Sequence, residues 1–216
     1  MNVTIPPSRN HPPATKYPPT SLKITPQPQS AKNKHTQIIA FIGYRGSGKS
    51  TIARALAQKL KYPIYSSDQL IEKTTKSTIA SLITKKGWAS FRTHEFTVIK
   101  TLLDNHFLSK KHPKIILDCG GGVVENTSLM DILSHSQVFI VYVKCSFPKI
   151  LHRLERTPRP SLIPDLTLYE ETKRKLNERT PLYEKYAHYT LHNYRHPNLV
   201  LATLLKHLTH RKFIIS

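Results

Sequence analysis

The chain carries Gly43-Tyr44-Arg45-Gly46-Ser47-Gly48-Lys49-Ser50-Thr51 directly after the apolar run 38–42. This sequence fits the pattern G-x-x-x-x-G-K-[ST] in the context that the pattern requires, a buried strand that turns sharply into a helix. The glycines let the backbone fold tightly enough to aim consecutive N–H groups into one concavity, where a phosphate meets the positive end of the helix. The sequence therefore predicts a phosphate-binding loop and a bound nucleotide.

The loop suggests separate roles for its side chains. Lys49 can reach the β- and γ-phosphates of a nucleotide, and the Ser50 hydroxyl is placed to bind Mg²⁺. A glycine-rich turn without a ligand is the alternative, but the agreement of strand, spacing, lysine and hydroxyl disfavours it. We expect the nucleotide to contact Arg45, Gly46, Ser47, Gly48, Lys49, Ser50 and Thr51.

The composition limits the class of protein. The 216 residues suffice for about one domain, and no apolar run approaches the roughly 20 residues of a membrane span. Cys119 and Cys145 lie inside apolar runs, which favours buried thiols in a reducing compartment over a disulfide. The formal net charge of +20 is compatible with nucleic-acid binding. No recognition motif accompanies it, so we favour an enzyme that handles phosphates.

Residues 1–35 differ in composition from the rest of the chain. They hold half of its 16 prolines, together with Ser, Thr and Lys but few bulky apolar residues. Such a segment buries too little surface to fold, so we predict a disordered basic tail before one folded domain at 36–216. The lack of acids is also typical of an organellar transit peptide. The proline density and the single Arg9 argue against one, and we expect a cytoplasmic protein.

Strand and helix patterns alternate from Thr36 onward. Short strand patterns, mostly apolar, lie at 38–42, 63–66, 114–119 and 138–143. Helices are predicted at 50–61, from 68 onward, and at 79–85, 90–105, 147–155, 168–186 and 198–207. This alternation predicts an α/β fold of three layers, with a parallel sheet covered by helices on both faces. Ligands then bind beyond the carboxyl ends of the strands, where the glycine loop lies.

Two further motifs follow the loop. Asp68 comes after the second strand, where it can accept a hydrogen bond from a substrate hydroxyl, and it suits the N-cap of the next helix equally well. Arg92 and Glu95 share a helix face at i,i+3, so the carboxylate can hold the guanidinium in one pose. A solvated surface ion pair is the alternative, and by itself the favoured one.

Three of the chain's seven glycines, Gly120 to Gly122, directly follow a predicted strand. They allow a ligand to approach the backbone closely, with Gly121 in the middle. Asp118, in the same run, is similar to the carboxylates that hold Mg²⁺ through water. A plain turn at the end of the strand is the alternative, which the number of glycines disfavours.

A rigid basic segment, Arg156-Thr157-Pro158-Arg159-Pro160, lies between two predicted helices, and Arg179-Thr180-Pro181 follows downstream. Loop arginines usually only meet solvent. Phosphoryl transfer, however, needs mobile cations that close over the transferring group and exclude water. This requirement favours a lid at about residues 153–166.

Taken in order, these motifs resemble the shikimate kinase family, P-loop enzymes of aromatic amino acid synthesis. The resemblance spans about residues 37–207. It implies transfer of phosphate from Mg-ATP to the 3-hydroxyl of shikimate, with Asp68 holding the hydroxyls and acting as general base. It also implies that Arg92 and Arg179 pair with the substrate carboxylate. Gly121 would offer its backbone N–H.

The resemblance implies further contacts with the nucleotide. Arg159 would contact the phosphates during transfer and, with Lys49 and Mg²⁺, stabilise the charge that spreads over the transferring group. Arg195, in Arg195-His196-Pro197, would lie near the adenine. The spacing in the lid leaves open whether Arg153 or Arg156 also approaches the adenine.

The chain departs from the family pattern in two places. The family often has Asp-x-Asp after the second strand, and Ser66 stands at the first of these positions. Either Asp118 supplies the missing carboxylate, or Ser50, water and ATP oxygens hold the metal. The lid sequence Arg-Pro-Leu-Leu appears here with Ser161 in its third position.

Two alternative functions stay open at this point. The first is another P-loop kinase, of the gluconate or nucleoside monophosphate type. The pair Arg92 and Arg179 favours an acceptor with a carboxylate and no phosphate. The second is a degenerate ATP-binding protein whose basic tail binds nucleic acid. We favour shikimate as the small-molecule partner, and we expect a monomer.

Overall fold

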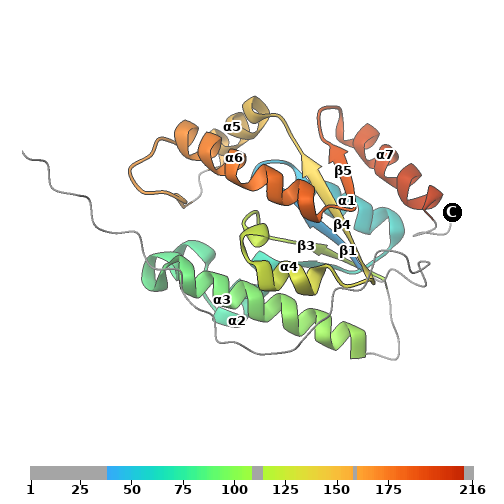
Figure 1. Cartoon of the computed structure of the whole chain (residues 1–216), viewed down its shortest axis with the longest axis horizontal. Coiled ribbons are helices and arrows are strands. Elements are labelled where there is room, and N and C mark those ends of the chain that lie inside the picture. Colours follow the sequence, from blue (N-terminus) through green and yellow to red (C-terminus); the bar gives the residue numbers. More distant parts are fainter. Residues whose placement is uncertain (1–37, 109–113, 158–159, 212–216) are drawn as a thin grey trace, which may run out of the picture. The chain divides into compact units, whose positions relative to one another are not determined.

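The computed structural model describes residues 38–108, 114–157 and 160–211, which all belong to one unit of the chain, 33–216. The predicted tail at 1–35 and Arg159 lie outside the described residues. Strands and helices alternate in the described part (Figure 1). The strands are β1 Ile38–Ile42, β2 Ile64–Ser66, β3 Ile115–Asp118, β4 Val138–Lys144 and β5 Tyr189–His192. The helices are α1 Lys49–Leu60, α2 Ser67–Thr75, α3 Ile79–Leu108, the 3₁₀-helix η1 Val123–Glu125, α4 Thr127–Leu133, α5 Phe147–Arg156, α6 Leu168–Tyr186 and α7 Pro197–His210.

The described strands form one parallel sheet in the order β2-β3-β1-β4-β5. β1 lies in the middle, between β3 and β4, so the glycine loop leaves the centre of the sheet at its carboxyl edge. Asp118 at the end of β3 pairs in register with Phe41 of β1 and with Ser66 of β2. The strand ends that precede the predicted site residues therefore meet at one edge, as expected for a parallel sheet.

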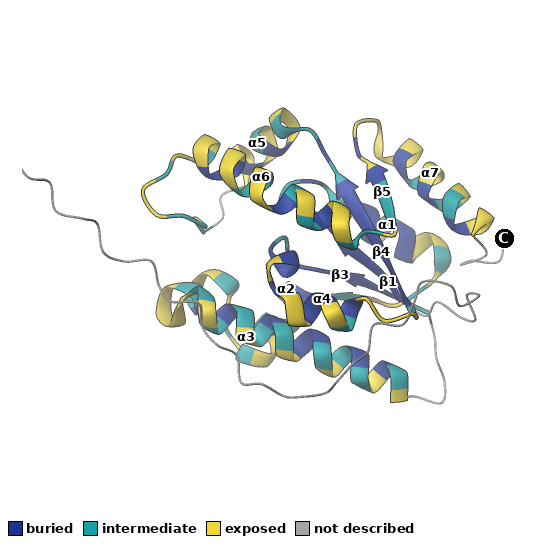
Figure 2. Cartoon of the chain, in the orientation of Figure 1, coloured by how far each residue is buried: buried dark blue, intermediate teal, exposed yellow. Residues whose placement is uncertain are grey.

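Both faces of the sheet are buried, as the alternating side chains of β1 show. Ile38, Ala40 and Ile42 pack into one hydrophobic cluster, to which helices α2 to α6 contribute. Ile39 and Phe41 pack into a second cluster, which α1 and α7 cover. Figure 2 shows buried strands inside and helices whose outer sides are exposed. The predicted three-layer α/β fold is confirmed.

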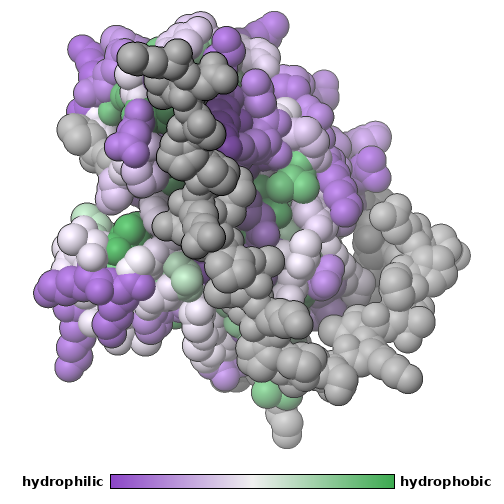
Figure 3. All heavy atoms as spheres, turned by 60° about the vertical axis from the view of Figure 1, so that its left-hand side comes forward, coloured by the Kyte–Doolittle hydropathy of each residue, from purple (hydrophilic) through white to green (hydrophobic). Residues whose placement is uncertain are grey.

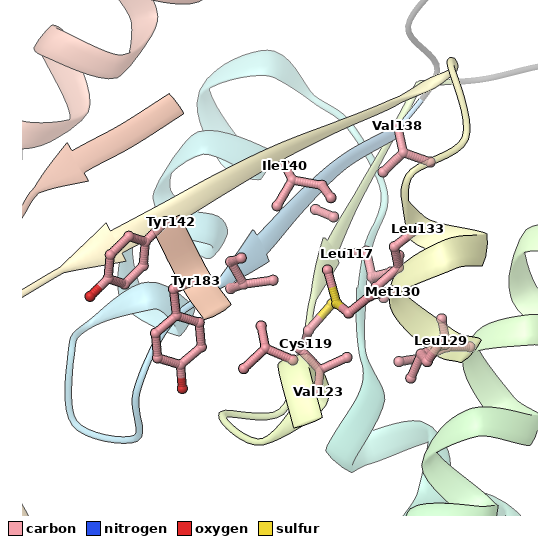
Figure 4. Packing of buried hydrophobic residues seen from close by; sticks show 14 of the residues in the cluster. Leu117, Cys119, Val123, Leu129, Met130, Leu133, Val138, Ile140, Tyr142 and Tyr183 are labelled. Carbon is pink, nitrogen blue, oxygen red and sulfur yellow. The ribbon is translucent and has the colours of Figure 1, made fainter. Parts of the chain in front are cut away.

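The first cluster joins the sheet to α4 and α6 (Figure 4). Met130 and Leu133 of α4 pack near Leu117 of β3, and Tyr183 of α6 stacks on Tyr142 of β4 with the ring centres 4.9 Å apart. This stacking fixes α6 against the sheet. The position of α6 matters for the site, because the helix carries Arg179.

Three elements were not predicted from the sequence: η1, α4 and β5. α4 has seven residues, and its N-cap is Asn126, whose side chain accepts a hydrogen bond from Leu129 N at 3.0 Å. The two helices predicted at 79–85 and 90–105 form α3, which is interrupted at Gly87 with φ 77° and ψ 171°. The kink therefore lies where the sequence placed the break.

The expected buried thiols are confirmed, since Cys119 and Cys145 are buried and unpaired. No helix in the described ranges combines the length and the apolar character needed to cross a membrane. Figure 3 shows a largely hydrophilic face with small, scattered hydrophobic patches.

Candidate active site

The loop between β1 and α1 has the geometry of a phosphate-binding loop. Gly43, Gly46 and Gly48 all have positive φ, a conformation that other residues adopt at a cost. Gly48 also has no room for a side chain, because a Cβ atom there would overlap Asn193 Nδ2. That amide donates a hydrogen bond to Ser47 O at 2.7 Å. Asn193 follows β5, so the far end of the chain supports the loop.

A cavity of about 370 Å³ opens over this loop. It is lined by Tyr44, Arg45, Gly46, Gly48, Lys49, Ser50, Thr51, Ile52, Arg54, Arg153, Leu154, Thr157, Asn193 and Pro197. Six of the seven predicted loop residues are in this set. Ser47 is the exception, because its side chain is buried beneath the loop. The volume and the basic lining suit the phosphates and sugar of a nucleotide.

The arginines predicted for the adenine end differ in their positions. Both Arg153 and Arg156 of α5 are exposed, but only Arg153 lines the cavity, and it donates to Gly46 O at 2.9 Å. The structure thus favours Arg153 for the position that the sequence left open. Arg195 is exposed and outside the lining, although Asn193 and Pro197 on either side of it are part of the wall.

Oxygen atoms that could bind a metal ion lie near Lys49. Asp118 Oδ1 is 3.5 Å from Lys49 Nζ, and both side chains are almost fully buried. This oxygen accepts no hydrogen bond from any other described residue. Ser50 lines the nucleotide cavity. Ser66, at the position of the family's first Asp, caps α2 by accepting from Gln69 N at 3.5 Å.

A second, smaller cavity of about 90 Å³ collects the predicted acceptor residues. Asp68 of α2, Arg92 of α3, Gly121 of the loop after β3 and Arg179 of α6 all line it. Arg45 lines both cavities, so the two share a wall. The remaining lining residues are Ile79, Ile83, Trp88, Phe91, Gly120, Gly122, Pro160 and Leu162. Sequence reasoning missed this apolar wall, although Trp88 next to the helix break was a visible signal.

Asp68 does not cap a helix. Ser66 is the N-cap of α2, which leaves Asp68 in the first turn, half-buried and facing the cavity. The start of α2 is tied to the loop after β3, because Ser67 Oγ accepts a hydrogen bond from Gly120 N at 2.8 Å. Asp68 is thereby held next to the loop that carries Gly121.

Arg92 is not in a solvated ion pair. Its Nη1 donates to Glu95 Oε2 at 2.5 Å, and Glu95 is fully buried. Burial raises the pKa of Glu95, which the neighbouring Arg92 opposes. The guanidinium lies over the rings of Trp88 and Phe91, with its carbon 5.7 and 5.2 Å from their centres. A Cβ atom at Gly122 would overlap this guanidinium, so a side chain there would displace Arg92 from this pose.

Arg179 is the most deeply buried arginine of the acceptor cavity, with only 3% of its side chain exposed. Its Nε and Nη2 donate to the two carboxylate oxygens of Glu125 at 3.0 and 2.8 Å. The face of the guanidinium lies 5.7 Å from the centre of the Tyr44 ring. Burial alone would raise the pKa of Glu125, but Arg179, with Arg92 and Lys175, lowers it. Sequence reasoning missed Glu125.

A buried glutamate joins the phosphate-binding loop to residues 160–163, which lie within the predicted lid segment. Glu171 of α6 pairs with the Arg45 guanidinium through Oε1. Its Oε2 accepts from Ser161 Oγ at 2.7 Å, Leu162 N at 2.5 Å and Ile163 N at 3.1 Å. Arg45 also donates to Pro160 O at 2.9 Å. Residues 160–163 are therefore tied to the phosphate-binding loop.

Parallel sheet, phosphate-binding loop and adjoining acceptor cavity together define a P-loop kinase that acts on a small molecule. A family model described as shikimate kinase matches residues 45–209. The shikimate kinase 2 of Yersinia pseudotuberculosis (serotype O:3, strain YPIII) is 33% identical over 180 residues, which cover 81% of this chain and 97% of that protein. The corresponding enzyme of Yersinia enterocolitica is 31% identical over 183 residues, 82% of this chain and 98% of that protein.

Solved structures of shikimate kinases share the fold of this chain. A shikimate kinase from Acinetobacter baumannii, determined in complex with shikimate, superposes with a TM-score of 0.72 at 24% identity and covers 84% of this chain and 97% of its own. The shikimate kinase of Aquifex aeolicus gives a TM-score of 0.63 at 27% identity, over 81% of this chain and 98% of its own. The chain belongs to the shikimate kinase family, and the protein is an ATP-dependent kinase.

Proposed function

We propose that the protein transfers the terminal phosphoryl group of ATP to the 3-hydroxyl of shikimate. The observation that carries this proposal is the acceptor cavity. Asp68, Arg92, Gly121 and Arg179 line it together, and Arg45 belongs to its wall and to that of the nucleotide cavity. A carboxylate, a hydroxyl and a phosphoryl donor can thus be held side by side.

On the nucleotide side, the backbone N–H groups of the loop hold the phosphates at the start of α1. Lys49 lies at the end of the loop next to Asp118 and supplies positive charge to the phosphate oxygens. Arg153 closes the wall of the cavity above Gly46. We assign Arg159 to the phosphates as well, on the family resemblance alone, since it lies outside the described residues.

On the acceptor side, Arg92 and Arg179 bind the carboxylate of shikimate, and the N–H of Gly121 binds a further oxygen. The rings of Trp88 and Phe91 form an apolar wall for the carbon skeleton. Asp68 accepts a hydrogen bond from the 3-hydroxyl and takes its proton as the phosphoryl group transfers. Bringing both reactants together in one orientation supplies much of the rate enhancement.

The residues beside Lys49 also fit a magnesium ion. Asp118 carries a buried carboxylate oxygen that accepts no hydrogen bond from the described residues, and Ser50 lines the nucleotide cavity. Hard oxygen donors of this kind, few in number, suit Mg²⁺, which keeps several waters and binds nucleotide phosphates. We propose that Ser50 and Asp118 hold it. The ion would neutralise charge on the phosphate oxygens.

We also propose a monomer in a reducing compartment such as the cytoplasm, a setting that fits the unpaired Cys119 and Cys145. Gel filtration coupled to light scattering tests the monomer, and a mass near twice that of the chain would contradict it.

The test of the function is the release of ADP from Mg-ATP on addition of shikimate, compared with quinate and gluconate. We expect turnover with shikimate to exceed turnover with the other two acids clearly. Asp68→Asn should abolish most of this activity, because the amide cannot take the proton. Equal turnover with gluconate, or full activity of Asp68→Asn, would overturn the proposal.

A further inference from the structure

The two arginines that line the acceptor cavity converge on one carboxylate of the protein itself. Glu125 Oε2 lies 2.8 Å from Arg179 Nη2 and 3.4 Å from Arg92 Nη2, while Glu125 Oε1 accepts from Arg179 Nε. The point at which both guanidinium groups meet is thus occupied by Glu125. An acceptor carboxylate that pairs with both arginines requires the same point.

Glu125 is placed so that it can leave. Glu125 is the last residue of η1, a short 3₁₀-helix that follows Gly120 to Gly122. Of its side chain 31% is exposed, against 3% for Arg179. Lys175 of α6 lies between two carboxylates, with its Nζ 2.8 Å from Glu178 Oε2 and 3.4 Å from Glu125 Oε1. Lys175 can therefore hold the carboxylate after the arginines have released it.

Arg179 is buried, so its positive charge requires a counter-ion in every state of the site. Removing the counter-ion of a buried charge strongly destabilises a protein, whereas exchanging one carboxylate for another leaves the charges balanced. Arg179 is fixed between Glu125 and the ring of Tyr44. An incoming acceptor carboxylate can thus replace Glu125 on Arg179 without leaving a buried charge unpaired in either state.

We propose that Glu125 is a built-in competitor for the acceptor carboxylate and thereby sets the affinity for the acceptor. The inference rests on the proposed function, because it requires an acid that binds Arg92 and Arg179. When the acceptor binds, Glu125 turns toward Lys175 and the acceptor carboxylate takes over its bonds. The protein thus keeps both arginines paired while the cavity is empty, and it binds the acceptor less tightly as a result.

The test is the dissociation constant of shikimate for the wild type and for Glu125→Gln. Trp88 is the only tryptophan of the sequence and lines the acceptor cavity, so its fluorescence reports binding. We expect Glu125→Gln to lower the constant about three- to tenfold, since one negative charge several ångströms from the ligand is removed. The methyl ester of shikimate, which has no charge, should bind both proteins with similar affinity.

Two more variants sharpen the test. Lys175→Met should raise the dissociation constant of shikimate by a larger factor in the wild-type background than in Glu125→Gln, because only in the wild type does it also affect the competing carboxylate. Glu184→Gln is the matched control for Glu125→Gln, because it removes an exposed carboxylate of α6 that pairs with Lys144. We expect the control to bind shikimate like the wild type.

The outcomes separate the inference from the proposed function. A wild type that neither binds nor phosphorylates shikimate refutes the function before any variant is made. A wild type that binds shikimate, combined with equal or weaker binding by Glu125→Gln, overturns the competition and leaves Glu125 as a residue that positions the arginines. If Glu125→Gln does not fold, Glu125→Asp decides, because the shorter side chain keeps the charge but reaches the arginines less well: tighter binding of shikimate supports the competition, and unchanged or weaker binding overturns it.

Discussion

Lys49 Nζ lies 3.5 Å from Asp118 Oδ1, so the lysine of the phosphate-binding loop is held by the carboxylate at the end of the neighbouring strand. Lys49 begins α1, which follows the central strand β1, and Asp118 ends the neighbouring strand β3; both side chains are nearly buried. This pair joins the phosphate-binding and metal-binding functions that the sequence suggested separately. Its two members can be tested one at a time.

Lys49→Ala should lower turnover about 10²- to 10³-fold, the usual effect of deleting one donor to a transition state. The coupled ADP assay measures it. Lys59→Ala, an exposed position on the same helix, is the control and should keep full activity. Near-normal turnover of Lys49→Ala would remove this lysine from the mechanism.

Asp118→Asn should raise the Mg²⁺ concentration needed for half-maximal activity about tenfold, a typical effect of weakening a metal site. The reason is that Ser66 caps α2 and brings no carboxylate to the metal. A magnesium titration at saturating ATP gives the result. Asp131→Asn, on the exposed side of α4, should titrate like the wild type, and an identical curve for Asp118→Asn would refute its role.

Glu171→Gln should destabilise the protein by about 3 kcal/mol, because a buried charge that pairs with Arg45 and accepts three hydrogen bonds from the lid segment is lost. It should also raise KM for ATP, since Arg45 loses its support. Urea unfolding and steady-state kinetics measure the two effects. Glu178→Gln, an exposed carboxylate of α6, should change stability by less than about 1 kcal/mol. A similar small change for Glu171→Gln would contradict the assignment.

Tyr183→Phe should raise KM for the acceptor and cost about 1 kcal/mol of stability. The Tyr183 hydroxyl donates to the carbonyl of Gly121, so its removal frees the loop that we propose contacts the acceptor. Tyr142→Phe is the matched control, because it deletes a hydroxyl from the ring that stacks on Tyr183. The control should lose stability without a change in KM. An unchanged KM for Tyr183→Phe would show that the loop needs no such support.

The pair of Glu125 with Arg179 should make stability depend on acid pH. The folded pKa of Glu125 lies below its ordinary value of 4.5, so its stabilising effect is complete above that pH and is lost as the pH falls below it. The difference in unfolding free energy between the wild type and Glu125→Gln should therefore shrink toward acid pH. Urea unfolding at neutral and acid pH tests this. A difference that stays constant would show that ionisation of Glu125 contributes nothing.

The sequence predicted those parts of the fold that local patterns specify. β1 and the glycine loop combine an apolar run with a fixed spacing of glycines, and both were confirmed. β5 was missed because only Leu191 of its four residues is buried, so it lacks a continuous apolar run. α4 was missed because seven residues are too few to show helical periodicity.

The same distinction holds for the site. Asp68, Arg92, Gly121 and Arg179 lie in recognisable motifs, and the structure brings them to one cavity. Glu125 has no local signal, because its partners stand 33 and 54 positions away in the chain. Only the pairing of strands and the docking of α6 bring such groups together.

The hydrogen bond from Asn193 to the loop joins residues 146 positions apart. During synthesis, the glycine loop leaves the ribosome long before Asn193 does, and domains tend to fold as whole units. A nascent chain that ends short of β5 lacks both an outer strand of the sheet and the amide that braces the loop. ATP capture should therefore begin only when translation of this unit is almost complete.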